Sequence, residues 1–206
     1  MSSQAMSCGS TLPSASRSGR SRQMNLWWRL LWELVSWRTR SKLHWSDVGI
    51  RSYRVWPTDL DIFNHMNNAK FLALLDLSRY DLALRSNTWK LWKKLGWYPV
   101  VVAETITFRK SLLPWQKFEI ESKVVGWDDI AFYFECRFTV KGEIYTTAHI
   151  KVRFLKRSHG IVTVDEVLAA DPSWVVHEPE MPEWVSRWAA DSALPKGKEP
   201  APSVWN

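Results

Sequence analysis

Three segments in which apolar and polar residues alternate, joined by very short turns, constrain this chain more than any other feature. The alternation runs over residues 117–124, 130–140 and 144–154, and a two-residue period is that of strands with one buried face. The turns Gly126-Trp127-Asp128-Asp129 and Lys141-Gly142 are too short to contain crossover helices. Neighbouring strands must therefore run antiparallel, in a meander with one apolar face.

A long apolar segment precedes this meander. Over residues 67–85, apolar side chains occupy most sides of a helix, as expected of a helix buried in a core: Phe71, Leu72, Leu74, Leu75, Leu77, Leu82 and Leu84. We expect a short strand over residues 51–56, before this helix, and a long strand over residues 100–109, after it. A short helix is expected over residues 164–170. The expected architecture is an α+β domain whose antiparallel sheet wraps around one long central helix.

The N-terminal region differs in composition from this domain. Residues 1–23 are rich in Ser, Gly and Arg, which predicts a disordered tail; an upstream start before Met24 explains this composition better than a transit peptide. From Asn25 to about Thr39, the polar side chains fall on one narrow arc of a helix, and leucines and tryptophans fill the rest. This amphipathic helix either lies in a membrane surface or packs on the domain or a dimer mate. We expect four segments: a tail (1–23), the amphipathic helix (24–45), the main domain (46–175) and a C-terminal extension (176–206).

Charge and cysteine content exclude several classes of protein. Of the net charge of +7, residues 1–45 carry +6, so the main domain is nearly neutral and a nucleic-acid groove is not expected. Cys8 and Cys136 are the two cysteines, which gives no disulfide framework and favours a reducing, cytoplasmic compartment. No apolar run reaches the roughly 18 residues that span a bilayer. Any membrane contact is therefore expected to be peripheral, through residues 24–43.

The loop before the central helix gathers polar side chains within ten residues, 59–68. A helix N-terminus offers unpaired N–H groups and partial positive charge, which polarise a carbonyl oxygen. A carboxylate just before it can act as a general base or a nucleophile toward that carbonyl. No second histidine lies at metal-ligand spacing from His65, so we expect neither a metal nor another cofactor.

The motif in this loop resembles a known family. The run Asp61-Ile62-Phe63-Asn64-His65-Met66-Asn67-Asn68, with Phe71 and Asp76 after it, resembles the hot-dog thioesterases of the 4-hydroxybenzoyl-CoA and acyl-carrier-protein type. Asp59-Leu60-Asp61, together with Gly126-Trp127-Asp128-Asp129 and Ala131-Phe132-Tyr133, is similar to the branch called thioesterase superfamily member six and its bacterial relatives. The resemblance covers about residues 56–154, and a weaker similarity extends over residues 181–188.

The resemblance implies a hot-dog fold and a thioesterase that cleaves acyl-CoA, or a related acyl-carrier thioester, into free acid and thiol. It implies Asp61 as base or nucleophile and the backbone near Asn68 as the oxyanion site, with His65 as the third catalytic candidate. The substrate-binding candidates are Asn64, Asn67 and Asp76. The resemblance also implies a homodimer with each site between two subunits. Phe63 stands where plant acyl-carrier-protein enzymes have Asn, which predicts weak activity.

Alternatives remain open for the protein and for single residues. The chain could bind an acyl group or acyl-CoA at a membrane surface without hydrolysing it. Asp61 could serve only to satisfy backbone N–H groups before the helix. Asp59 is expected to be structural, pairing with a neighbour or capping the loop. Asp76, inside the central helix, is expected to pair with Arg79 one turn on. His149 is expected to be exposed on the polar face of the sheet.

Overall fold

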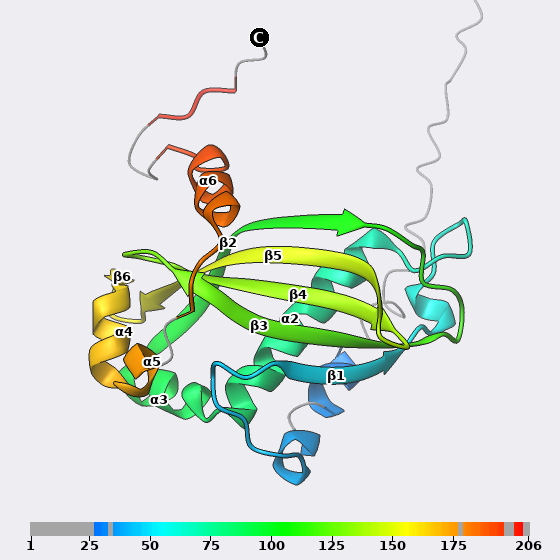
Figure 1. Ribbon diagram of the computed structural model, residues 1–206, viewed down its shortest axis with the longest axis horizontal. Coiled ribbons are helices and arrows are strands. Elements are labelled where there is room, and N and C mark those ends of the chain that lie inside the picture. The colour runs from blue at the N-terminus through cyan, green and yellow to red at the C-terminus, as the bar shows by residue number, and fades with distance from the viewer. Residues whose placement is uncertain (1–26, 33–34, 177–178, 196–199, 204–206) are drawn as a thin grey trace, which may run out of the picture.

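The chain folds into a curled antiparallel sheet with one long helix across its concave face (Figure 1). The computed structural model describes residues 27–32, 35–176, 179–195 and 200–203. The predicted disordered tail, residues 1–23, lies outside this part of the chain. The strand order is β1-β3-β4-β5-β2, with a short β6 paired to β5. Their bounds are β1 Gly49–Arg54, β2 Trp97–Phe108, β3 Lys117–Trp127, β4 Phe132–Val140, β5 Glu143–Lys156 and β6 Ile161–Val162.

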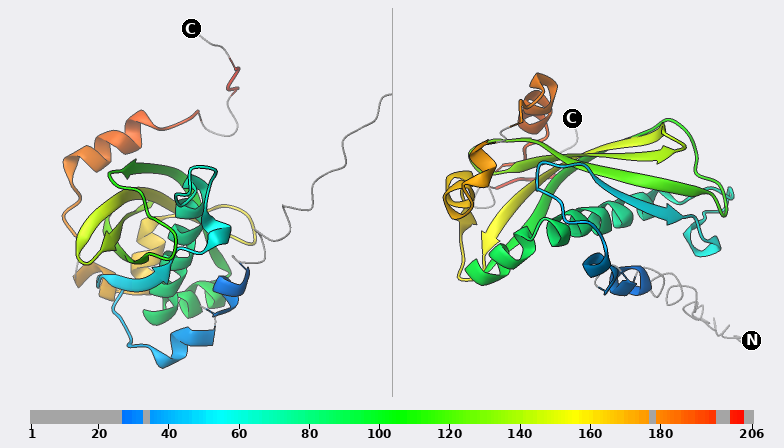
Figure 2. Two further views of the ribbon diagram at one scale, coloured as in Figure 1. Left: turned by 90° about the vertical axis from the view of Figure 1, so that its right-hand side faces the viewer. Right: turned by 60° about the horizontal axis from the view of Figure 1, so that its bottom comes forward.

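The predicted meander is confirmed. Strands β3, β4 and β5 pair antiparallel, with Ile120 opposite Phe138 and Cys136 opposite Ala148. These four side chains are completely buried, so they form the apolar face that the alternation predicts. The central helix is confirmed too: α2, Asn68–Arg85, packs on this face, and Figure 2 shows the sheet curling around it. This arrangement is the hot-dog fold.

The central helix ends at Arg85 as predicted, but the second helix after it was not anticipated from the sequence. Asn87 has a left-handed backbone (φ 66°) and turns the chain into a second helix, α3, Thr88–Leu95. Asparagine tolerates this conformation better than most residues. Gly96 ends α3 with φ 69°, where a side chain would be strained. Helix α3 leads directly into the edge strand β2.

The predicted N-terminal amphipathic helix is seen in part. Residues 27–32 and 35–36 are helical, and the 3₁₀ turn η1, Trp37–Thr39, follows. Arg29 fastens this segment to the domain because its Nη2 lies 2.6 Å from Oδ2 of Asp59, in the 3₁₀ turn η2, Pro57–Asp59. No helix within the described ranges is both long and apolar enough to cross a membrane.

The C-terminal region covers part of the outer face of the sheet. After α4 (Val164–Ala170) and α5 (Ser173–Val176), the helix α6 (Glu183–Asp191) lies on the opposite side of the sheet from α2 (Figure 2). Its Val185 packs on Tyr133 of β4. Trp184 lies edge-on to the ring of His149, with centroids 4.4 Å apart. The expectation of an exposed His149 is therefore wrong: its side chain is 13% exposed, because α6 covers it.

Candidate active site

Backbone hydrogen bonds hold together the two ends of the loop before α2. Leu60 and Met66 form an antiparallel bridge, and the Asp61 N–H donates to the His65 carbonyl at 2.8 Å. Oδ1 of Asp61 accepts from the Phe63 N–H at 2.9 Å and from the His65 N–H at 3.2 Å. The Asp61 carboxylate thus stabilises its own loop, as Asp often does in turns, and these hydrogen bonds fix its position.

Two further contacts fix the loop in the fold. The Met66 N–H donates to the Leu112 carbonyl at 2.9 Å, and the Asn67 N–H donates to the Asp59 carbonyl at 2.8 Å. The Asp59 side chain is buried, pairs with Arg29 and accepts from the Trp56 N–H at 2.9 Å. The expected pairing of Asp59 is therefore found, and this residue supports the loop from behind.

Asn67 caps the start of α2. Its side-chain oxygen accepts from the Ala69 N–H at 2.9 Å, and its carbonyl accepts from the Lys70 N–H at 2.8 Å. The Asn68 N–H, at the first helical position, donates to no group among the described residues. An unpaired N–H remains at the positive end of the 18-residue helix.

Asp61, His65 and Asn68 line one hollow of about 260 Å³. Phe71 and Phe108 form its apolar wall, with ring centroids 5.0 Å apart. The structure thus brings the three candidate catalytic residues together. A carboxylate, an imidazole and a helix N-terminus share a space large enough for the reacting end of a thioester.

The three candidate substrate-binding residues lie elsewhere. Asn64 is exposed at the tip of the loop with φ 61°, and Asn67 is occupied as the cap; neither lines the hollow. Asp76 lies two turns along α2, where it pairs with Arg79 as expected. Its side chain is 57% exposed, not sunk in the core as the apolar helix implied, and it borders a different cavity.

The hollow also has a basic rim that the sequence did not reveal. Arg109 and Lys110, which follow β2, line it together with Ser111. Both pair with Glu143, through Nη1 at 2.8 Å and Nζ at 2.7 Å. Hydrogen bonds from Lys110 and Arg109 lower the pKa of the Glu143 carboxyl. Two adjacent basic residues after a strand are too common a pattern to have marked a site.

Asp61 and His65 line this hollow as two potential metal ligands, fewer than a protein metal site ordinarily uses. Across the described ranges, no cluster of three or more His, Cys, Asp or Glu side chains is placed to hold a metal ion. The carboxylate of Asp61 and the backbone N–H of Asn68 can act together on a polar, uncharged group such as a carbonyl.

Known proteins share this sequence and fold. Protein THEM6 of Xenopus laevis is 36% identical over 135 residues, which is 65% of this chain and 63% of that protein. The chain spans less than two thirds of the length of the curated relatives it matches first. A probable thioesterase of Escherichia coli, YbaW, shares the fold with a TM-score of 0.56 at 19% identity, over 59% of this chain and 94% of that one.

A second solved structure has the same fold. A hypothetical protein of Staphylococcus aureus, solved in complex with CoA, superposes with a TM-score of 0.55 at 14% identity, over 70% of this chain and 96% of that one. The family model of the thioesterase-like superfamily matches residues 55–189. Since this match runs from the loop before Asp61 into α6 and covers more than half of the 206 residues, the chain belongs to the thioesterase-like superfamily.

Proposed function

We propose that the protein hydrolyses acyl-CoA thioesters to a free acid and CoA. The observation that carries this proposal is the Asp61 carboxylate and the unpaired Asn68 N–H in one hollow. Membership of the thioesterase-like superfamily supports the reaction class. The CoA bound by the Staphylococcus aureus protein of the same fold supports CoA as the thiol.

In the proposed reaction, Asp61 takes a proton from a water molecule whose oxygen adds to the thioester carbonyl. Oδ1 is held by two backbone N–H groups, whereas Oδ2 accepts no hydrogen bond from a described residue, which leaves it for the water. The Asn68 N–H donates to the carbonyl oxygen as negative charge develops there. The C–S bond then breaks, and the proton passes from Asp61 to the departing sulfur.

The basic rim suits the remainder of the substrate. Arg109 is 55% exposed and Lys110 43% exposed, so both can turn toward a ligand without leaving a buried charge unpaired. Arginine and lysine are the usual partners of phosphate oxygens. We propose that Arg109 and Lys110 bind the phosphates of CoA. Without a ligand, both side chains pair with Glu143 instead.

We expect the proposed enzyme to hydrolyse its substrate slowly, and Phe63 is the reason. Its side chain is 72% exposed at the loop tip and does not line the hollow. This position therefore supplies no polar group to the hollow. Catalysis rests on Asp61 and Asn68, with His65 beside them.

A thiol-release assay on the full chain tests the reaction. Acyl-CoA substrates from four to eighteen carbons are supplied, and the free thiol is measured with a colorimetric thiol reagent. We expect release that is linear in enzyme. Binding of non-hydrolysable S-alkyl-CoA thioethers, without thiol release from any acyl-CoA, would reject hydrolysis and favour a protein that holds its ligand unchanged.

A peripheral membrane location is favoured by a separate observation. Trp27, Trp28 and Trp32 of the N-terminal helix are 69%, 67% and 65% exposed. The contact between Arg29 and Asp59 holds this helix beside the active-site loop, whose Ile62 is 92% exposed. Tryptophans at the headgroup level are typical of helices that lie in a membrane surface. We propose that the hollow draws its acyl substrate from a membrane.

Replacing the three tryptophans tests this location. The triple variant Trp27→Ser, Trp28→Ser, Trp32→Ser of the full chain is expected to lose at least tenfold in binding to vesicles containing anionic lipid, because its apolar face is removed. Flotation of the vesicles on a density gradient measures this. Trp184→Ser, an exposed tryptophan on α6, is the control and should float like the original. Unchanged flotation of the triple variant would assign the helix to packing on protein.

We also propose a homodimer that joins at β2. This strand is an edge of the sheet, and it exposes Val101 (37%), Val102 (45%) and Phe108 (42%). An apolar edge strand is a template for pairing with a second chain. Because Phe108 also lines the hollow, a partner at this edge would lie next to the active site.

A lysine on each edge of the sheet tests the dimer. Val102→Lys on β2 is expected to weaken association at least tenfold, because a charge would be buried in the contact between the two subunits. Ile50→Lys, on the opposite edge strand β1 where Ile50 is 47% exposed, is the matched control and should remain dimeric. Light scattering after size-exclusion chromatography gives the mass. Equal behaviour of the two variants would contradict pairing at β2.

A further inference from the structure

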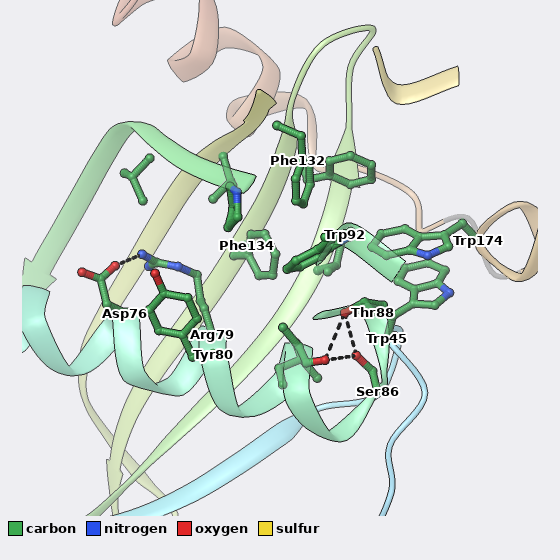
Figure 3. Close-up of a pocket in the computed structure, with 17 residues that line it drawn as sticks. Trp45, Asp76, Arg79, Tyr80, Ser86, Thr88, Trp92, Phe132, Phe134 and Trp174 are labelled. Carbon is green, nitrogen blue, oxygen red and sulfur yellow. Dashed lines mark hydrogen bonds and ion pairs between the residues drawn. The ribbon is translucent and has the colours of Figure 1, made fainter. Parts of the chain in front are cut away.

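A second cavity, of about 70 Å³, lies beside the C-terminal half of α2 (Figure 3). Helix α2 and helix α3 form one side, and the inner face of β4 and β5 forms the other. Its wall is largely aromatic and includes Trp45, Trp92, Trp174, Phe132, Phe134 and Phe154. The reaction proposed above uses none of these residues.

The end of this cavity farthest from Asp76 is bounded by two tryptophans, and its one unsatisfied side-chain donor among the described residues is the buried Nε1–H of Trp45. Trp45 and Trp174 stack with centroids 4.0 Å apart. The Ser86 and Thr88 hydroxyls lie 3.0 Å apart, and the Thr88 hydroxyl donates to the Ala83 carbonyl at 3.2 Å. Since these hydroxyls already have partners, a guest at this end gains mainly from apolar contact.

The other end of the cavity is charged. Asp76 and Arg79 form an ion pair there, and Figure 3 shows this pair on the side away from the stacked tryptophans. Nη1 of Arg79 also lies 3.5 Å from Oε1 of Glu104 on β2, but it makes no hydrogen bond to a described residue. Burial raises the pKa of Glu104 even with Arg79 beside it. The contact across this entrance is loose, so it can open while Arg79 stays on Asp76.

The two cavities lie along one seam between α2 and β2. At one end Phe71 packs on Phe108 beside the Asp61 hollow; farther along, Arg79 reaches Glu104. From Asn68 to Asp76 the helix rises roughly 12 Å, at about 1.5 Å per residue. An extended hydrocarbon chain advances about 1.25 Å for each C–C bond of ~1.5 Å. A chain that starts at the Asn68 N–H reaches the charged entrance at about its tenth carbon.

We propose that this aromatic cavity binds the methyl end of a saturated acyl chain of about ten to fourteen carbons, whose thioester lies at Asp61. This assignment rests on the proposed thioesterase function and gives it a substrate class. The volume of about 70 Å³ is about half that of the ~150 Å³ cavities that hold benzene. It therefore admits the last few carbons of an aliphatic chain and rejects an aromatic ring or a much longer chain.

Chain-length dependence of binding tests the assignment. Each methylene that enters the cavity is expected to raise affinity roughly fourfold. Calorimetry with S-dodecyl-CoA and S-butyl-CoA thioethers, on the full chain, should give dodecyl binding at least tenfold tighter than butyl. Ala83→Leu, at a buried residue in the cavity wall, should lower dodecyl affinity at least tenfold and leave butyl affinity within twofold. Ala190→Leu, exposed on α6, is the matched control and should alter neither.

A second variant changes the cavity in the opposite direction. Trp174→Phe places a smaller ring at the far end of the cavity, which lengthens it and should shift the preferred thioether from dodecyl toward hexadecyl. If Ala83→Leu lowers the melting temperature so far that binding cannot be measured, this variant decides alone. Equal changes for short and long thioethers, or no shift in Trp174→Phe, would overturn the assignment even if thiol is released. Length-dependent binding that Ala83→Leu abolishes, without thiol release, would keep the assignment and reject hydrolysis.

Discussion

Replacing Asp61 with asparagine is expected to lower kcat for acyl-CoA hydrolysis about 10²- to 10⁴-fold, the usual contribution of a positioned general base. Asparagine keeps the side-chain oxygen that accepts from the Phe63 and His65 N–H groups, so the loop should retain its shape. What it lacks is the basic oxygen for the water proton. Thiol release at saturating substrate measures kcat, and calorimetry with an S-alkyl-CoA thioether should give an unchanged Kd.

The separation of kcat from binding decides between the two roles of Asp61. If it only satisfies backbone N–H groups, asparagine should do so nearly as well and turnover should persist, which would place the chemistry elsewhere in the hollow. Loss of turnover together with loss of thioether binding would mean that the loop had collapsed. Asp165→Asn, an exposed carboxyl on α4, is the matched control and should change neither quantity.

The parts of the fold that the sequence predicts are those recorded in local patterns. The two-residue alternation of β3 to β5 and the apolar run of α2 follow from burial of one face or of most sides. Helix α6 was missed because its position depends on a distant partner. Gly126 shows this dependence: a Cβ added there would lie only 2.4 Å from Cβ of Met181. Because glycine has no side chain, the C-terminal segment can pack closely on the sheet at this point. No local sequence pattern links these two residues.

The candidate site divides in the same way. Asp61, His65 and Asn68 lie within eight residues of the sequence, at the start of one helix, so they are close together in space by their spacing alone. Arg109 and Lys110 join them only because β2 ends beside α2. Asn68 lines the hollow, whereas Asn64 and Asn67 do not. The difference comes from the left-handed backbone of Asn64 and from the capping hydrogen bond of Asn67, which local sequence does not reveal.

Removing the carboxylate of Asp81 should destabilise the fold more than any surface change on the same helix. Asp81 is 1% exposed and pairs with Arg40 and with Arg85, whose Nη1 lies 3.2 Å away. Arg85 is itself buried and donates from Nε to the Ser41 carbonyl at 2.8 Å. This cluster ties the segment before β1 to α2. Asp81→Ala leaves a buried guanidinium without its counter-ion, which costs about 3–5 kcal/mol of the free energy of unfolding.

Asp76 provides the matched comparison because it is an aspartate on the same helix that also pairs with an arginine, Arg79. Its side chain is 57% exposed, and Arg79, which is 10% exposed, keeps the Glu104 carboxylate 3.5 Å away, so Asp76→Ala should cost less than Asp81→Ala, about 1 kcal/mol. Urea unfolding followed by far-ultraviolet circular dichroism gives both free energies. A similar cost for the two variants would mean that water reaches the Asp81 cluster. A large cost for Asp81→Ala alone would show that burial, and not the ion pair as such, makes this carboxylate indispensable to the N-terminal attachment.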